Sequence, residues 1–139
     1  FHAHAAKRDS STSRGLGDVY KRQGKGDIFI LGSEAGVIGK KKATLYSAAK
    51  FGLRGFAQAL RNEAGPAGVR VCLINPGMVR SPFFDTLEFE PDGLETNAIE
   101  TEDIAKIVFD FLGTRHGTII DEINLSPASK SLKFKKSSK

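Results

Sequence analysis

The chain has 139 residues, a net charge of +5 and 40% hydrophobic residues, which are values typical of one ordinary globular domain. No apolar run approaches the roughly 20 residues that a membrane span needs, and the N-terminus lacks the apolar core of a signal peptide. The sequence therefore predicts a cytoplasmic protein with no membrane partner.

The positive charge is concentrated at the two ends of the chain. Residues 1–26 carry six Lys or Arg against two acidic residues, and residues 130–139 carry five Lys and no acidic residue. Residues 27–129 between them hold ten basic and fourteen acidic residues. A nucleic-acid-binding domain places basic residues on folded elements and interleaves aromatic residues, which neither end does. We therefore predict a basic flexible tail at 130–139 and no nucleic-acid partner; binding through that tail is an alternative that predicts strongly salt-dependent affinity.

Residues 1–26 have no helical or strand periodicity and are rich in Ser, Gly and charge, so we interpret them as a disordered or non-native leader. The apolar run "DIFILGS" from Asp27 predicts a buried strand. A Gly-rich loop then leads to a predicted helix from about Thr44 to Ala64.

Gly65 and Pro66 end that helix, and "VRVCLIN" predicts a second strand that is stopped by Pro76. Cys72, the only cysteine, lies in this apolar run, which indicates a buried and unreactive residue. Strand, helix and strand together form a βαβ unit.

Residues 81 to about 100 are predicted to be irregular, and Thr101 is predicted to cap a second helix that ends at Gly113. The apolar residues of this helix fall on one face: Ile104, Ile107, Val108, Phe111 and Leu112. "GTIIDEINL" then predicts a third strand. The alternation of strands and helices across 27–129 indicates an α/β fold in which helices cover a parallel sheet.

The first predicted helix carries Tyr46 and Lys50 four residues apart, so their side chains lie one turn apart on one face. A free phenol is a weak acid at neutral pH, and a nearby ammonium stabilises its phenolate form. The pair therefore suits general acid–base chemistry, although a Tyr and a Lys at this spacing also occur by chance on solvated helices. A separate apolar stripe is predicted to pack against the sheet or a partner helix: Leu45, Ala49, Gly52, Phe56 and Leu60.

The C-terminal ends of the two predicted strands on either side of this helix also carry candidate site residues. Ser33 lies at the C-terminal end of the first predicted strand, thirteen residues before Tyr46, and the turn from Asn75 to Gly77 closes the next strand. Parallel sheets place their sites at the carboxyl ends of their strands. We therefore expect both strand ends to meet the helix face.

These residues resemble the classical short-chain dehydrogenase/reductase family, in which a Ser, a Y-x3-K helix and a following P-G turn recur in this order and at similar separations. The resemblance runs from about Gly26 to Leu125, and "YSAAKFGLRGFAQALRNE" and "INPGMVRSPF" are its most characteristic segments. It implies the C-terminal half of a Rossmann-type doubly wound parallel sheet, with about three strands and two main helices. It also implies an enzyme that transfers a hydride between NAD or NADP and a small carbonyl/alcohol substrate.

The resemblance assigns catalytic roles to three residues. Tyr46 would exchange a proton with the substrate oxygen, and Ser33 would hydrogen-bond that oxygen. Lys50 would hold the nicotinamide ribose and support the proton transfer by Tyr46.

Four residues at and after the end of the second strand would line the nicotinamide: Pro76, Gly77, the backbone of Val79, and Ser81. Ser81 stands where the family more usually has Thr, and it keeps the hydroxyl. Phe83 and Phe84 follow, and we interpret them either as the floor of a substrate pocket or, equally, as an ordinary loop anchor.

The sequence also departs from the family. The T-G-x3-G-x-G turn of the dinucleotide site and the N-N-A-G segment are absent from the chain. Such a glycine turn brings backbone N–H groups and a helix N-terminus to the pyrophosphate. We therefore predict a fragment that is inactive by itself and that leaves the choice between NAD and NADP open. The resemblance further implies that the intact protein is a homodimer or homotetramer.

A non-catalytic function is the alternative. An assembly or scaffold piece would use the small residues of the first helix for oligomer contact only: Ala48, Gly52, Gly55 and Ala59. The combination of Ser33, Tyr46 and Lys50 favours the enzyme, since packing alone does not require it. No Cys, His and carboxylate spacing suits a metal, so no metal site is predicted.

Overall fold

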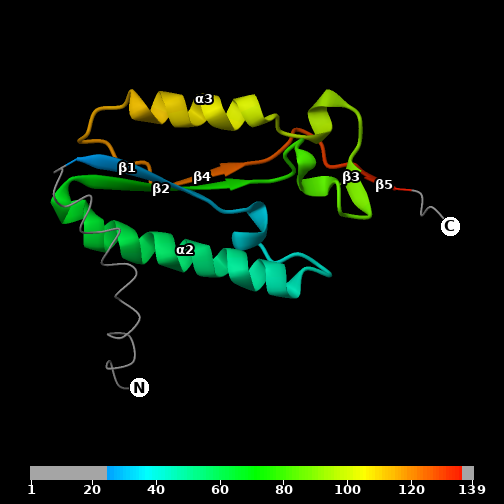
Figure 1. The fold of residues 1–139 in the computed structure, drawn as a ribbon, viewed down its shortest axis with the longest axis horizontal. Helices are drawn as coiled ribbons and strands as arrows, with labels where there is room; N and C mark the ends of the chain where they lie inside the picture. Colours follow the sequence, from blue (N-terminus) through cyan, green and yellow to red (C-terminus); the bar gives the residue numbers. More distant parts are fainter. Residues whose placement is uncertain (1–24, 136–139) are drawn as a thin grey trace, which may run out of the picture.

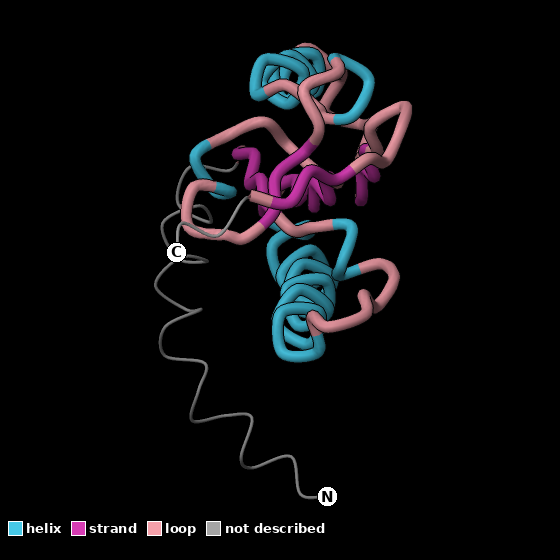
Figure 2. Tube along the Cα trace, turned by 90° about the vertical axis from the view of Figure 1, so that its right-hand side faces the viewer, coloured by secondary structure: helices cyan, strands magenta, loops and turns pink. Residues whose placement is uncertain are grey.

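The computed structural model describes residues 25–135, in which two helices enclose a small parallel sheet (Figure 1). The sheet has the strand order β1-β2-β4, with β1 at Gly26–Leu31, β2 at Val69–Pro76 and β4 at Glu122–Leu125. Helix α2 (Thr44–Ala64) covers one face and α3 (Thr101–Leu112) covers the other, as Figure 2 shows from the side. The predicted α/β architecture is confirmed. None of the helices in this part of the chain is long and apolar enough to cross a membrane.

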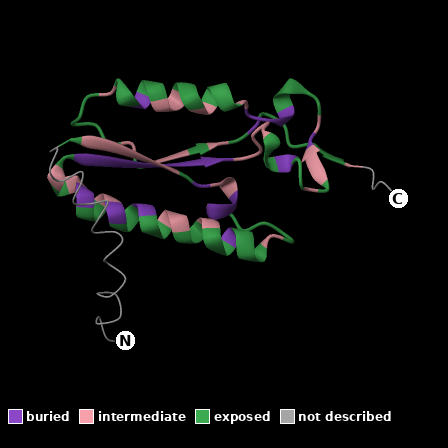
Figure 3. Ribbon diagram, in the orientation of Figure 1, coloured by how far each residue is buried: buried purple, intermediate pink, exposed green. Residues whose placement is uncertain are grey.

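Strand β2 is the centre of the core, and all eight of its residues are buried (Figure 3). Because successive side chains of a strand point to opposite faces, β2 supplies both cores. Val69 and Val71 pack with Leu60 and Ala64 of α2. The other face has its own cluster: Cys72 and Ile74 with Phe111 of α3. A strand covered on both faces reads as a continuous apolar run, which is why its sequence is so apolar.

The predicted packing of the apolar stripe of α2 on the sheet is wrong except at Leu60, and its packing on a partner helix stays a prediction. Leu45 is 86% exposed, and Phe56 also faces solvent. The residues that α2 buries are Ser47, Ala57, Leu60 and Ala64. Small side chains allow the helix axis to approach the sheet closely, and the larger apolar residues of the predicted stripe are left on the open side of the helix.

Helix α3 differs from its prediction at its first turn. Glu100, not Thr101, is the N-cap, because its side chain accepts a hydrogen bond from the backbone of Asp103. The backbone N–H of Glu100 in turn donates to Oδ2 of Asp103 at 3.1 Å, which completes a capping box. A carboxylate can accept hydrogen bonds from the free N–H groups of a helix start as a hydroxyl can. Glu100, one residue before Thr101, is therefore able to be the N-cap. Leu112, predicted on the apolar face, is exposed.

A second sheet pairs two short antiparallel strands, β3 (Phe89–Pro91) and β5 (Leu132–Phe134). Strand β3 and the 3₁₀ turns Pro82–Phe84 and Glu95–Asn97 give order to the segment predicted to be irregular. Strand β5 lies inside the stretch predicted to be a flexible tail. Its apolar and basic residues alternate with the period of a strand, a pattern that the high lysine content concealed. Most of the predicted leader, residues 1–24, and residues 136–139 lie outside the described part of the chain.

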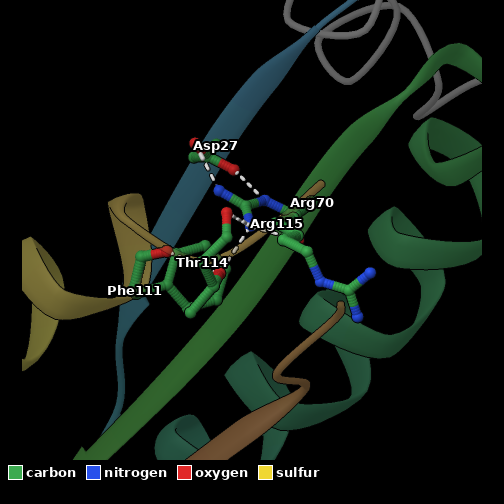
Figure 4. Close-up of polar contacts among 5 residues, drawn as sticks. All are labelled: Asp27, Arg70, Phe111, Thr114 and Arg115. Atoms are coloured by element: carbon green, nitrogen blue, oxygen red, sulfur yellow. Dashed lines mark hydrogen bonds and ion pairs between the residues drawn. The ribbon is translucent and has the colours of Figure 1, made fainter. Parts of the chain in front are cut away.

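A buried ion pair joins the N-terminal ends of the strands (Figure 4). The guanidinium of Arg70 donates to both carboxylate oxygens of Asp27 at 2.5 and 3.0 Å, and to Oγ1 of Thr114 at 2.7 Å. The ring of Phe111 lies 4.5 Å from the guanidinium carbon. The hydrogen bond to Asp27 outweighs the burial and raises the pKa of Arg70, which keeps the group charged. Ser33 lies at the opposite end of β1, so this pair stabilises the fold and is remote from the candidate site.

Candidate active site

The candidate site begins where β1 ends, at Ser33. Ser33 is the N-cap of the 3₁₀ turn η1 (Glu34–Gly36), and its Oγ accepts a hydrogen bond from the backbone N–H of Ala35 at 3.1 Å. The turn packs directly on α2, since a Cβ placed on Gly36 would lie 2.7 Å from the carbonyl oxygen of Lys50. Any side chain at position 36 would push the Ser33 turn away from the helix.

Tyr46 and Lys50 lie on one face of α2, as their spacing predicted. The Lys50 ammonium lies 5.6 Å from the centre of the Tyr46 ring, and the Tyr46 side chain remains partly open to solvent. Within residues 25–135, Lys50 forms no ion pair with a carboxylate. Its charge is therefore free to act on Tyr46 and on a ligand in this part of the structure.

Ser47 ties the loop before α2 to the helix, and the sequence analysis did not single it out. The Ser47 side chain is buried, and its Oγ accepts a hydrogen bond from the backbone N–H of Lys40 at 3.2 Å. This contact fixes the loop between η1 and α2 to the first turn of the helix. A serine beside Tyr46 in the first helical turn was the available signal, because serine in such turns readily bonds to backbone groups.

Asn75 links the ends of all three strands of the main sheet. Its amide nitrogen donates to Oε1 of Glu122 and to Oδ1 of Asn124, both at 2.9 Å, and Oε2 of Glu122 accepts from Nε of Arg54 on α2 at 3.0 Å. A Cβ on Gly32 would lie 2.2 Å from Oδ1 of Asn75, so only glycine fits at the end of β1. The network fixes the strand ends that flank the Ser33 turn.

The turn at Pro76 and Gly77 lies against the Ser33 turn. The N–H of Gly77 donates to the carbonyl of Leu125 at 2.8 Å, and a Cβ on Gly77 would lie 3.4 Å from Oε2 of Glu34 and 3.0 Å from Cδ of Pro127. The Ser33 turn therefore contacts both the Lys50 region of α2 and this turn. The structure thus brings the three predicted segments to the same end of the sheet.

Val79 and Ser81 continue from this turn into the following loop. Val79 forms a parallel bridge with Ile99, and the N–H of Arg80 donates to the Ile99 carbonyl at 2.8 Å. Ser81 Oγ donates to the Val79 carbonyl at the long distance of 3.4 Å. The bridge holds the backbone of Val79 in place, and the weakly bonded Ser81 hydroxyl can turn to another acceptor.

The two phenylalanines occupy different environments. Phe84 is buried, with its ring centre 5.2 Å from that of Phe83 and 5.9 Å from that of Phe89, whereas Phe83 is mostly exposed. A pocket of about 390 Å³ lies beside Phe84. Its walls are Arg80, Ser81, Phe84, Asp85, Glu90, Pro91, Gly93 and Lys133, and they include none of the three predicted catalytic residues. Phe84 therefore anchors its loop and lines a pocket, and its contact with a substrate stays a prediction.

Other reactive groups play no part in this site. Burial raises the pKa of the Cys72 thiol to about 11, so the group is a protonated, unreactive thiol at neutral pH. Within residues 25–135, no group of three or more His, Cys, Asp or Glu side chains could hold a metal ion.

The family model of the short chain dehydrogenases matches residues 11–91, which is more than half of the chain. The chain therefore belongs to the short chain dehydrogenase family. The match contains Ser33, Tyr46, Lys50 and the Pro76–Gly77 turn, and it begins within the predicted leader.

Named relatives are oxidoreductases of several kinds. The chain is 30% identical over 111 residues to a sepiapterin reductase of Chlorobaculum tepidum, covering 80% of this chain and 44% of that protein. It is 37% identical over 97 residues to a 3-dehydrosphinganine reductase of Arabidopsis thaliana, covering 64% of this chain and 29% of that protein. The chain thus spans less than half the length of these relatives.

A solved structure shares the fold. The closed form of a serine dehydrogenase complexed with NADP⁺ superposes with a TM-score of 0.69 at 25% identity, covering 81% of this chain and 48% of that one. The matched part of that enzyme is again about half a chain.

Proposed function

We propose that residues 27–129 form the C-terminal half of an NAD(P)-dependent oxidoreductase that transfers a hydride between the nicotinamide and a small carbonyl/alcohol substrate. The observation that carries the proposal is the Lys50 ammonium 5.6 Å from the Tyr46 ring, on a helix whose backbone contacts the Ser33 turn. The proposal includes a cytoplasmic location and no nucleic-acid partner. A scaffold role for the open face of α2 is the alternative.

In this proposal Tyr46 donates its hydroxyl proton to the carbonyl oxygen during reduction and accepts a proton from the alcohol during oxidation. Ser33 hydrogen-bonds the same oxygen and fixes its position. The ammonium of Lys50, beside the Tyr46 ring, supports this proton transfer through its positive charge. When bound, the nicotinamide supplies or accepts the hydride.

The residues of the chain fit one end of such a cofactor. Lys50 without a carboxylate partner in the described residues, the fixed backbone of Val79 and the weakly bonded hydroxyl of Ser81 are donors and acceptors suited to a ribose and a carboxamide. The sequence holds no glycine-rich turn for the pyrophosphate. NADP and NAD therefore stay equal candidates for the intact protein.

Variants of Lys50 and Ser33 in the intact protein test these roles. Lys50→Ala should raise the KM for the cofactor and lower kcat, because the ammonium both holds the ribose and supports Tyr46, with a loss in kcat/KM of about 10²-fold or more. Ser33→Ala should lower kcat and leave the cofactor KM near its original value. Steady-state kinetics with both substrates varied separates the two patterns.

Lys106→Ala is the matched control, because Lys106 is exposed on α3 and pairs only with the neighbouring Asp110 within the described residues. Unchanged kinetics in Lys50→Ala, or a loss equal to that in Lys106→Ala, would contradict the assignment.

We further propose that the intact protein is a homodimer or homotetramer that uses the open face of α2. This face carries the exposed small residues Ala48, Gly52 and Ala59, with Leu45 and Phe56 beside them. Small residues let two helices approach closely, and an apolar helix face in water favours association.

Ala59→Arg in the intact protein should shift the sedimenting species toward the monomer, because the long charged side chain blocks close helix contact. Ala105→Arg on the exposed side of α3 makes the same substitution away from this face and should leave the sedimentation unchanged. An unchanged mass in Ala59→Arg would count against the contact.

A further inference from the structure

After β4 the chain turns back across the carboxyl ends of the strands. Pro127 is buried against the turn at Gly77, with its Cδ 3.0 Å from the position of a Cβ on that glycine. The N–H of Ser129 then donates to the carbonyl of Thr96 at 2.8 Å. We call residues 127–135 the strap, and Figure 1 shows its strand β5 beside β3, at the end of the main sheet toward which the strand arrows point.

The strap follows the loop 81–99 over most of that loop's length. The N–H of Asp92 donates to the carbonyl of Ser131 at 3.1 Å, and the N–H of Lys135 donates to the carbonyl of Glu88 at 2.8 Å. The Lys135 ammonium donates to the carbonyls of Phe84 and Asp85. These bonds join the strap to the beginning, middle and end of the loop.

One side chain of the strap reaches the Ser33 turn. The Lys130 ammonium forms an ion pair with Oε1 of Glu34, which also accepts from Nζ of Lys40 at 3.1 Å. Partial burial by itself raises the pKa of Glu34, but the ammonium groups of Lys130 and Lys40 together outweigh the burial and lower it. Glu34 is therefore a carboxylate at neutral pH, and it follows Ser33 directly in the chain.

The strap has little apolar surface to hold it in place. Phe134 is 72% exposed and Leu132 is 46% exposed. A two-stranded sheet of three residues a strand is not stable by itself. Beyond the buried Pro127 at its start, the docking of the strap depends on its hydrogen bonds, on the contact between Lys130 and Glu34, and on the longer ion pair of Lys133 with Glu90 at 4.0 Å.

We propose that the strap sets the position of loop 81–99 beside the Ser33 turn, and that Lys130 is the positioning residue that fastens it, through Glu34. Docking of the strap also completes the pocket beside Phe84, because Lys133 of β5 forms one of its walls. Loss of the Lys130 contact raises the fraction of time that the strap is undocked and the pocket is open on that side. The docking of the strap thus sets how open the pocket lined by Ser81 and Phe84 is.

Hydrogen exchange of the 139-residue chain tests the proposal without cofactor or turnover, so its result is separate from that of the proposed function. The amides of Asp92, Ser129 and Lys135 report docking, and the amide of Gly32, bonded to the Ile74 carbonyl at 2.7 Å, reports the main sheet. Lys130→Ala should speed exchange of the first three about twofold to fivefold, the range expected for a partly exposed ion pair, and leave Gly32 unchanged. High salt should speed exchange in the unaltered chain more than in the variant, because the variant keeps only the ion pair of Lys133 with Glu90 between strap and loop.

Charge exchange gives the second measurement. Glu34→Lys should speed exchange of the strap amides further, because it places three ammonium groups together, and adding Lys130→Glu should restore slow exchange. Lys106→Ala removes an exposed ion pair of α3 and is the control that should change nothing. The proposal is overturned by unchanged strap exchange in Lys130→Ala, by equal acceleration at Gly32, by lack of rescue in the double variant, or by free exchange of the strap amides in the unaltered chain.

Discussion

Tyr46→Phe in the intact protein is expected to abolish carbonyl reduction while leaving cofactor binding largely unchanged. The substitution removes only the hydroxyl, so the ring and the Lys50 ammonium 5.6 Å from its centre stay in place. Loss of a positioned general acid lowers a rate by about 10²- to 10⁴-fold, and no other phenol of the described residues can replace it. The measurements are NADPH and NADH oxidation with several ketones and quinones, and cofactor binding by calorimetry.

The control for this variant is Tyr20→Phe, which changes the only other tyrosine of the chain. Near-normal turnover in Tyr46→Phe would sink the catalytic assignment. Lack of turnover in the unaltered intact protein would instead favour the scaffold alternative, in which the hydroxyl of Tyr46 has no role and only the small residues of α2 matter.

The central βαβ unit could be predicted from the sequence because its signals are local. Gly65 and Pro66 end the helix, and β2 is a continuous apolar run because the sheet and both helices cover it. Which face of α2 packs on the sheet could not be predicted from the sequence. Periodicity identifies an apolar stripe, but two faces of this helix are rich in small and apolar residues, and packing on β2 selected the one with Ala57 and Ala64.

Strand β5 was missed for a different reason. Its pairing with β3 joins residues about forty positions apart, and its single lysine between two apolar residues was counted as part of a charged tail. A lysine-rich segment is an unstructured, solvated tail only when its backbone has no strand to pair with. Here β3 provides that strand.

The candidate site also has one part that could be predicted from local patterns and one part that could not. The approach of Lys50 to Tyr46 follows from the pitch of a helix, and the position of Ser33 follows from the rule that parallel strands end at one edge. The contacts of Glu34 with Lys130 and of Asn75 with Glu122 join residues 96 and 47 positions apart. No local pattern announces such contacts, because they exist only once the tertiary fold has brought the strand ends together.

The 139-residue chain alone is expected neither to reduce carbonyls nor to bind dinucleotide at physiological concentration, although it carries all three predicted catalytic residues. Among the described residues, β1 pairs with β2 on one side only, and its residues are only half-buried where those of β2 are buried throughout. An open edge and the exposed apolar residues at Leu31 and on α2 favour association with other chains over a rigid monomer.

Catalysis needs more than the three side chains. Hydride transfer requires nicotinamide and substrate to be held in near contact beside Tyr46, and effective positioning of this kind supplies about 7 to 11 kcal/mol of a barrier. The proposed contacts hold only the nicotinamide end of a cofactor, and the sequence has no glycine-rich turn for the pyrophosphate. A ligand held at one end keeps most of its freedom of rotation, so the reacting atoms are seldom aligned.

Calorimetry with NADPH and NADH, together with oxidation assays on the isolated chain with ketones and quinones, measures both parts of this prediction. No saturable heat and no turnover above that of the Tyr46→Phe variant are expected. Saturable binding near micromolar, or turnover that Tyr46→Phe removes, would mean that half of the sheet builds a competent site. The Gly77 turn, the strap and α2 would then hold the cofactor without the pyrophosphate contacts on which this prediction depends.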